Sequence, residues 1–444
     1  MEAYHNPMSI PFAFPFCTAS ITTGTTNSMQ TSSPWMDTRI WSRLPQRLVD
    51  RVIAFLPPAA FFRSRSVCKR WYALLFSHNF LELYLQVSPR HHWFLFFKHK
   101  SPLDNNFIYK KGSANGNDNG TSTEEGYAFD PDTLNWYRLF FPLVPPGFSP
   151  ASSSGGLICW VSEEAGAKNL LLSNPLFGSL TPLPSTLRPR LFPSVGLTVT
   201  NSSIDIVVAG DDLISPYAVK NLTTESFHID GGGFYSKWGT TSSLPTLCSL
   251  ESGRMVHVQG RFYCMTYSPF SVLSYDISTN YWCKVQAPMR RFLRSPSLVE
   301  SKGKLILIAA VEKSKLNVPR SLRLWALQDC GTAWAETERM PQQLYLQFAE
   351  VEGGRGFDCV GHGEFIFILV RGSDKALLFD FYRKRWAWVP PCPYVRGNCG
   401  GNIGAQGGGG GGDELHGFVY EPRLATPVTG LLEQLTLPFQ SFNG

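Results

Sequence analysis

Histidine, carboxylate and cysteine side chains are considered first, because they carry most metal-binding and acid–base chemistry in proteins. The histidines cluster at one place only, where His91, His92 and His99 flank the apolar run WFLFFK. We expect this run to be a strand, in which alternation points His91 and His92 to opposite faces. A metal centre is therefore not expected there, and no cofactor is predicted for the chain.

The other candidates for covalent chemistry are isolated. Glu163 and Glu164 form a carboxylate pair, but adjacent residues of a strand point apart, which favours a solvated turn. Cys68 lies in a helical segment, and we expect it to be a core residue and not a nucleophile. The sequence contains no GxSxG, P-loop or HExxH signature. These patterns indicate a chain without catalytic residues.

A concentration of positive charge is the second feature with chemical meaning. The whole chain has a formal net charge of +6, and residues 289–323 alone hold nine basic and two acidic residues. Such a segment favours binding to an anion, either DNA phosphate or an acidic protein surface. The alternative is an ordinary solvated loop, which is what a run of charges usually is. The cations expected to form this basic patch are Arg290, Arg291, Arg294, Lys313, Lys315 and Arg320.

A recurring pattern predicts the fold that positions these cations. An apolar strand ends at a polar residue, and six positions later a large residue begins the next strand. The clear cases are Asp130/Trp136, Asp276/Trp282 and Asp380/Trp386, and the weaker ones are Asn174/Leu180, Asn221/Phe227, Gln328/Trp334 and a partial Glu421/Pro427. A spacing of roughly 50 residues is typical of four-stranded propeller blades. We therefore predict a mainly β fold, a β-propeller of six or seven blades over residues 92–440.

The order of strands in a blade predicts the face on which each loop lies. With the strands named a to d, the b–c loops and the links between blades open on one face. The a–b and c–d turns open on the other. The segments SLVES, LILIAAV and SLRLWAL are expected to be strands a, b and c of one blade. All six cations of the basic patch would then lie on the face of the b–c loops, opposite Lys302 and Lys304.

Residues 36–87 have a helical pattern instead. Pro45 suits a first helical position, and a second apolar series includes Val67 and Trp71. The side chains that recur every four residues in the first series are Leu44, Leu48, Val52 and Leu56. Three or four short helices cannot bury all of these groups among themselves. We predict that this module docks another protein; the alternative is an ordinary helical cap on the propeller.

The remaining segments and the cysteines indicate which parts are flexible and in which cellular compartment the protein is expected. Residues 1–35 are rich in Ser, Thr, Pro and Asn and are expected to be a disordered tail. The Gly-rich segments 112–123 and 397–413 are expected to be flexible loops. The ten cysteines are scattered singly, with no CxxC pair, which favours a reducing compartment. No basic n-region of a secretory signal precedes IPFAFPF, and the apolar runs are too short to span a membrane.

The helical module resembles a known motif. LP at 44–45, Leu48, Val52, LP at 56–57 and VCKRW at 67–71 match the F-box in order and spacing. The resemblance implies binding to a Skp1-like adaptor and, through it, to a cullin in a ubiquitin ligase. The residues that it assigns to the adaptor contact and its joint are Leu44, Pro45, Leu48, Val52, Leu56, Val67, Cys68 and Trp71.

The likeness extends from about residue 34 to residue 440. Segments such as AGDDLISPYAVKNL, PMRRFLRSPSL and AAVEKSKLNVPRSLRLW resemble a family of plant F-box proteins with a kelch-type propeller. That family acts in floral meristems, as the substrate-recognition subunit of a ligase and as a co-regulator of the transcription factor Leafy. The resemblance implies a Leafy-type partner, DNA near the basic face, and a location in the nucleus and also the cytoplasm. Two alternatives stay open, a transcriptional co-factor independent of ubiquitination and a propeller enzyme.

Overall fold

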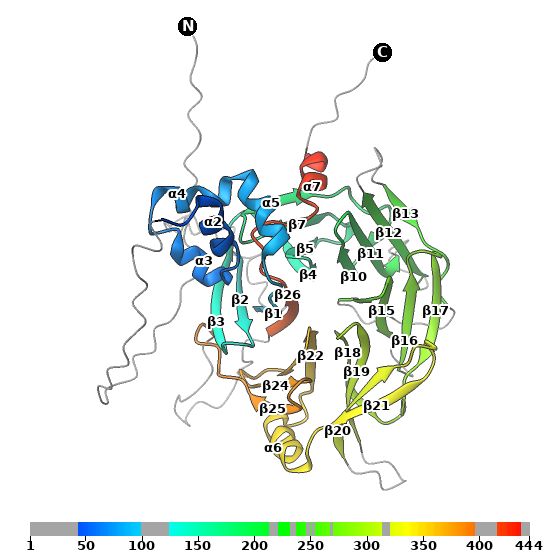
Figure 1. Cartoon of the computed structure of the whole chain (residues 1–444). Coiled ribbons are helices and arrows are strands. Elements are labelled where there is room, and N and C mark those ends of the chain that lie inside the picture. Colours follow the sequence, from blue (N-terminus) through cyan, green and yellow to red (C-terminus); the bar gives the residue numbers. More distant parts are fainter. Residues whose placement is uncertain are drawn as a thin grey trace, which may run out of the picture.

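The computed structural model describes the chain as a small helical module followed by a ring of β-sheets (Figure 1). The residues that it describes are 43–98, 124–212, 221–230, 237–245, 250, 254–266, 270–312, 320–395 and 415–436. The predicted tail at 1–35, the two Gly-rich segments, Lys313 and Lys315 lie outside the described residues.

The helices of the module begin and end where local sequence requires it. They are α2 (Gln46–Ala54), α3 (Pro58–Ser64), α4 (Lys69–Ala73), the 3-10 helix η1 (Leu74–Phe76) and α5 (His78–Val87). Pro45 precedes α2 as its N-cap and not as its first helical residue. Cys68 and Ser77 cap α4 and α5, since their side chains accept hydrogen bonds from the backbone N–H of Trp71 and Phe80, each at 3.4 Å.

Six sheets are arranged as six blades, which confirms the predicted β-propeller and sets its blade count. In each blade the strands are given from inner strand a to outer strand d. The first blade contains β26 (Leu415–Tyr420), β1 (Trp93–Lys98), β2 (Glu124–Asp130) and β3 (Asn135–Phe141), and the second contains β4 (Phe148–Ser154), β5 (Leu157–Ser162), β7 (Leu170–Asn174) and β8 (Ser179–Pro182). The third contains β10 (Ser194–Val199), β11 (Ser203–Asp212), β12 (Asn221–Asp230) and β13 (Trp238–Thr240). Two short strands, β6 (Gly166–Ala167) and β9 (Pro189–Arg190), extend the third sheet.

The second half of the ring has the same organisation. The fourth blade contains β14 (Val256–Val258), β15 (Arg261–Thr266), β16 (Ser271–Asp276) and β17 (Tyr281–Gln286), and the fifth contains β18 (Leu293–Ser301), β19 (Lys304–Val311), β20 (Ser321–Leu327) and β21 (Trp334–Arg339). The sixth contains β22 (Phe357–His362), β23 (Phe365–Val370), β24 (Ala376–Asp380) and β25 (Arg385–Trp388). Helix α6 (Gln342–Glu352) links the last two blades, and α7 (Thr429–Thr436) follows β26.

The last strand of the chain closes the ring. β26 pairs antiparallel with β1, in a register that aligns Tyr420 with Trp93, and so provides the inner strand of the first blade. The partial repeat predicted at Glu421 and Pro427 is therefore wrong, because these residues follow the closing strand and begin no further blade. The predicted turn between Asn221 and Phe227 is also wrong, since both residues lie within β12.

The polar residue of the repeat holds the c–d turn, as its position predicted. The Asp276 carboxylate accepts backbone hydrogen bonds from Ser278 and Thr279 at 3.0 and 3.2 Å, and Asp380 accepts equivalent bonds from Tyr382 and Arg383 at 2.8 and 2.9 Å. Carboxylate and amide side chains stabilise turns in this way. All the c–d turns and the a–b turns lie on one face, here named the turn face, and the b–c loops and links form the loop face.

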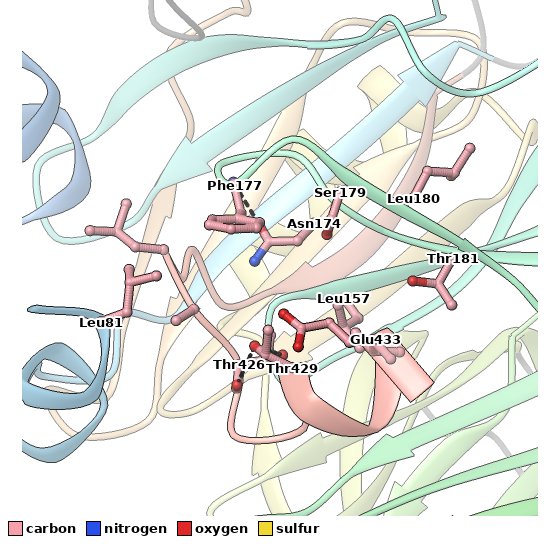
Figure 2. Close-up of a pocket in the computed structure, with 13 residues that line it drawn as sticks. Leu81, Leu157, Asn174, Phe177, Ser179, Leu180, Thr181, Thr426, Thr429 and Glu433 are labelled. Atoms are coloured by element: carbon pink, nitrogen blue, oxygen red, sulfur yellow. Dashed lines mark hydrogen bonds between the residues drawn. The ribbon is translucent and has the colours of Figure 1, made fainter. Parts of the chain in front are cut away.

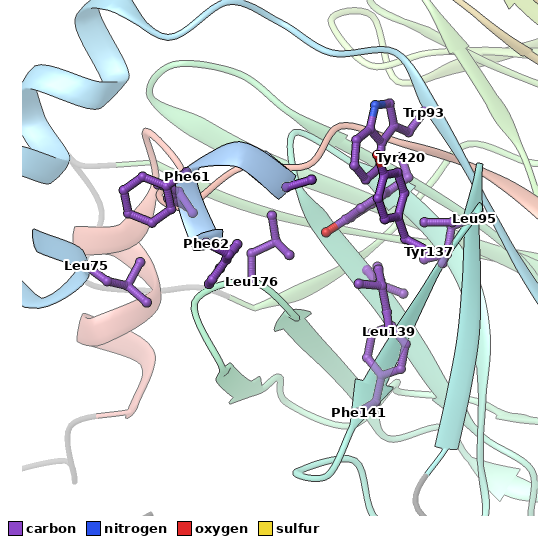
Figure 3. Packing of buried hydrophobic residues seen from close by; sticks show 14 of the residues in the cluster. Phe61, Phe62, Leu75, Trp93, Leu95, Tyr137, Leu139, Phe141, Leu176 and Tyr420 are labelled. Atoms are coloured by element: carbon purple, nitrogen blue, oxygen red, sulfur yellow. The ribbon is translucent and has the colours of Figure 1, made fainter. Parts of the chain in front are cut away.

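The helical module packs on the turn face, where β1 begins. Phe61 and Phe62 of α3 share one buried cluster with Trp93, Tyr137 and Leu176 of the first two blades (Figure 3). Burial of a Phe side chain stabilises a fold by about 1.5–3 kcal/mol. The propeller therefore covers much of the apolar surface that we expected only another protein to cover, and that part of the prediction is wrong.

Candidate docking surface and basic face

An apolar ridge on α2 stays uncovered. Leu48, Val52 and Phe55 are 49%, 43% and 49% exposed. Residues separated by four and then three positions lie on one side of a helix, so these three side chains form a continuous stripe. On the other side of α2, Ile53 and Ala54 are buried in the shared core. The helix thus has two apolar sides, one facing its own fold and one facing solvent.

A second exposed apolar pair lies at the join of α4 and η1. Tyr72 and Phe76 are exposed, with their ring centroids 6.4 Å apart. Arg65 is buried beneath them: its Nε donates to the Tyr72 carbonyl at 3.1 Å, and its guanidinium lies 4.5 Å from the Tyr72 ring centroid. Burial lowers the pKa of Arg65, and the proximity of Tyr72 opposes this shift. Because Arg65 fixes this corner, the two rings are held outward without covering by the propeller.

An ion pair joins α2 to α4. Arg70 donates through one nitrogen to both carboxylate oxygens of Asp50, at 2.6 and 2.7 Å. Both side chains remain partly exposed, so the pair contributes modestly to stability. Its effect is positional, since it sets the orientation of the Leu48 ridge relative to the segment that begins at Val67.

The structure separates the eight predicted contact residues into two groups. Pro45, Leu48, Val52, Val67 and Cys68 are exposed, and Leu44 is half-buried. Leu56 and Trp71 pack against the shared core, so they do not lie on the open ridge. Cys68 is a solvent-exposed helix cap, and its prediction as a core residue is wrong.

Sequence reasoning missed Phe55, Tyr72 and Phe76. Phe55 could have been found, because it follows Val52 by three positions and completes the stripe. Tyr72 and Phe76 carry no such signal, since only the position of Arg65 turns them outward. We name Leu48, Val52, Phe55, Val67, Tyr72 and Phe76 together the docking surface.

A small cavity lies where the module, the second blade and the C-terminal segment meet (Figure 2). Its volume is about 170 Å³, and Leu81, Phe177 and Leu432 are among its lining residues. Some of its polar groups are engaged within the fold. The Asn174 amide donates to the Arg423 carbonyl at 3.1 Å, its oxygen accepts from the backbone, and the Thr429 hydroxyl donates to the Thr426 carbonyl at 2.7 Å. The Glu433 carboxylate also lines the cavity, which lies beside the helical module.

Three of the predicted cations lie on the loop face. Arg290 and Arg291 lie in the link between β17 and β18, and Arg320 directly precedes β20. Lys302 and Lys304 lie at the opposite, turn face, between β18 and β19. The frame of strands a to d thus predicts the side on which each of these residues lies.

The prediction that Arg294 belongs to the basic patch is wrong. Its guanidinium forms ion pairs with Glu352 of α6 at 2.5 Å and with Glu312 at 3.3 Å. The hydrogen bond to Glu352 raises the pKa of Arg294, and burial opposes this shift. Arg294 is therefore neutralised inside the fold and is not a free cation of the loop face.

Two absences hold for the described part of the chain. Its His, Cys, Asp and Glu residues form no group of three or more that could hold a metal ion. Among the same residues, no helix has the length and apolar content needed to cross a membrane.

Comparison with protein families agrees with this two-part architecture. A family described as F-box domain matches residues 41–83, which contain the docking surface. A family described as KIB1-4 beta-propeller matches residues 128–348. Both parts of the predicted fold, an F-box module and a propeller, are thereby confirmed.

Whole-chain relatives cover both parts. The chain is 62% identical over 439 residues to Protein UNUSUAL FLORAL ORGANS of Arabidopsis thaliana, with 98% of each chain covered. It is 44% identical over 425 residues to Protein ABERRANT PANICLE ORGANIZATION 1 of Oryza sativa subsp. indica, covering 90% of this chain and 92% of the relative. It is 24% identical over 394 residues to SKP1-interacting partner 15 of Arabidopsis thaliana, covering 81% and 96%. The chain belongs to the family of plant F-box proteins that includes UNUSUAL FLORAL ORGANS and ABERRANT PANICLE ORGANIZATION 1.

Proposed function

We propose that the protein is the substrate-recognition subunit of a Skp1–cullin–F-box ubiquitin ligase. The observation that supports this most directly is the exposed ridge of Leu48, Val52 and Phe55 on an F-box helix whose other side is already buried. A folded monomer gains nothing from such a stripe, whereas a partner that covers it removes apolar area from water. One relative is named as a SKP1-interacting partner, which supports a Skp1-type adaptor as the occupant.

The ligase role has a direct test in the full-length protein. Leu48→Ala combined with Val52→Ala is expected to weaken binding of a purified plant Skp1 protein by roughly 2–4 kcal/mol, as for buried interface anchors. Isothermal titration calorimetry measures this loss. The matched control is Leu346→Ala, which removes an exposed apolar side chain from α6 of the propeller. Unchanged adaptor affinity in the double variant would contradict the proposed function.

The propeller is proposed to recruit a Leafy-type transcription factor on DNA. The protein is proposed to be located in the nucleus and also in the cytoplasm. The family resemblance and the floral names of the relatives support this partner. Of the cations predicted for the basic patch, Arg290, Arg291 and Arg320 are described, lie on the loop face and support contact with a phosphate backbone or an acidic partner. Because phosphate contacts release counterions, assembly on DNA would weaken as salt rises.

The loop-face proposal is tested by removing positive charge from each face in turn. Arg290→Ala, Arg291→Ala and Arg320→Ala together are expected to reduce co-assembly with a Leafy-type factor on DNA and to lower its salt dependence. Lys302→Ala with Lys304→Ala removes positive charge from the turn face and is expected to have little effect. Equal assembly of both variants would remove the loop face from DNA binding. Loss of adaptor binding with retained transcriptional activity would instead favour the co-factor alternative.

A further inference from the structure

The helical module has an excess of cations that its own fold does not use. Residues 43–76 contain seven Lys or Arg residues and one acidic residue, Asp50. Arg65 is buried, and Arg70 is held by Asp50. The others are exposed and have no ion-pair partner among the described residues: Arg43, Arg47, Arg51, Arg63 and Lys69.

Two of these cations lie directly beside the apolar ridge. Arg47 precedes Leu48 and Arg51 precedes Val52 on α2. Each step along a helix turns by about 100°, so Arg47 and Arg51 form a parallel ridge next to the apolar one. Lys69 occupies a comparable place near Val67, at the start of α4. The docking surface is thus apolar in its middle and positively charged along its border.

This arrangement has a cost for the chain alone. Like charges four residues apart on a helix repel each other, and no carboxylate of the module other than Asp50 lies within residues 43–76 to offset them. The repulsion becomes attraction only when an external surface brings negative charge to it. The arginines therefore have a physical explanation as part of an interface.

We infer that the docking surface is built for an acidic protein, one with an apolar centre to cover Leu48, Val52 and Phe55 and carboxylates that face Arg47 and Arg51. This inference rests on the proposed function for the existence of the adaptor contact and adds the charge that the adaptor carries. A nucleic acid would match the cations, but it would leave the apolar stripe in water. The two ridges have separate effects: the cations speed association, and the apolar side chains slow dissociation.

The test measures the association kinetics of the full-length protein with a purified plant Skp1 protein at several salt concentrations. Arg47→Gln with Arg51→Gln is expected to lower the association rate constant about tenfold at low ionic strength, with the dissociation rate constant little changed. The difference should disappear near 1 M salt, where charges are screened within about 3 Å. Arg47→Lys with Arg51→Lys retains the charge and should restore the association rate, which separates charge from a folding defect.

The control changes the same net charge elsewhere. Lys284→Gln with Lys375→Gln removes two exposed cations from the propeller and should leave the association rate near that of the parent. Absence of any adaptor binding by the parent protein would contradict the proposed function itself. Binding whose association rate is indifferent to salt and to Arg47→Gln/Arg51→Gln would overturn the acidic partner alone. Tighter binding of duplex DNA than of the adaptor through Arg47 and Arg51 would also overturn it.

Discussion

The indole Nε1 of Trp136 donates a hydrogen bond of 2.9 Å to the carbonyl of Pro390, across a separation of 254 residues in the chain. Trp136 is the second residue of the outer strand of the first blade, and Pro390 lies two residues after the outer strand of the sixth. The same contact recurs between other neighbouring blades, where Trp238 donates to Pro184 and Trp334 to Gln286. The Trp of the sequence repeat therefore joins neighbouring blades through a hydrogen bond from its indole N–H.

Replacement of Trp136 by Phe should weaken the closure of the ring. The aromatic packing is largely kept, and the lost hydrogen bond costs about 1 kcal/mol of unfolding free energy. Hydrogen exchange should accelerate in β26 and β1, the strands that close the first blade. Trp334→Phe removes an equivalent bond between the fourth and fifth blades and should leave exchange in β26 unchanged. Equal exchange of β26 in both variants would contradict a closing role for Trp136.

Two phenylalanines of the F-box module should respond in opposite ways. Phe61 is buried in the core shared with the propeller, so Phe61→Ala should lower the free energy of unfolding by roughly 3–5 kcal/mol. Phe55 is half exposed on the docking surface, so Phe55→Ala should change stability by only about 0.5 kcal/mol while weakening adaptor binding. Denaturant unfolding measures both. A small effect of Phe61→Ala would show that the module and the propeller do not share one core.

One turn residue should be open to stabilisation. Leu134 has a φ of +55°, a left-handed backbone that costs a residue with a Cβ atom roughly 1–2 kcal/mol. Leu134→Gly should therefore raise the melting temperature. Leu134→Ala keeps the Cβ atom and therefore the backbone strain, so it serves as the control in which no gain is expected. A lower melting temperature for the Gly variant would mean that the partly exposed Leu134 side chain makes contacts worth more than the backbone strain.

Acid should weaken the fold through His362. Burial lowers the pKa of His362 to about 4, against the opposing hydrogen bond of 2.9 Å between its Nδ1 and the Trp93 carbonyl. The unfolded chain, with a His pKa of about 6.5, then binds a proton that the folded chain does not, so stability falls as pH falls from about 6.5 to 4. His362→Gln should flatten that part of the pH profile relative to the parent. An identical slope in both proteins would contradict a neutral His362 in the fold.

Local sequence patterns predict most of the propeller because the strand–turn–strand arrangement recurs from blade to blade with the same kind of turn residue. Asp276 and Asp380 hold turns by bonds to residues two and three positions away, which a sequence pattern can reveal. The failure at Asn221 has the same origin, since a polar residue at the start of a long strand has the same local pattern as one at the end of a strand. Ring closure by β26 depends on a partner more than 300 residues away, and no local pattern encodes it.

The docking helix shows how periodicity can mislead. A repeat of four drifts by about 40° per step around a helix of 3.6 residues per turn, so Leu56 moves away from the side of Leu48. Moreover, α2 ends at Ala54, and Leu56 lies beyond it against the shared core. The prediction of Arg294 as a free cation fails for a similar reason, because Glu352 neutralises its charge from a helix 58 residues later in the chain. Such long-range partners set which residues of a candidate site are free.

The central claim is that an adaptor covers the ridge of Leu48, Val52 and Phe55. Hydrogen exchange of the full-length protein, with and without a plant Skp1 protein, tests it directly. The account predicts slower exchange in residues 46–55 and 67–76 when the adaptor is bound, and unchanged exchange in β18, β19 and β20. A stable complex that protects strands of the loop face and leaves α2 unprotected would contradict it.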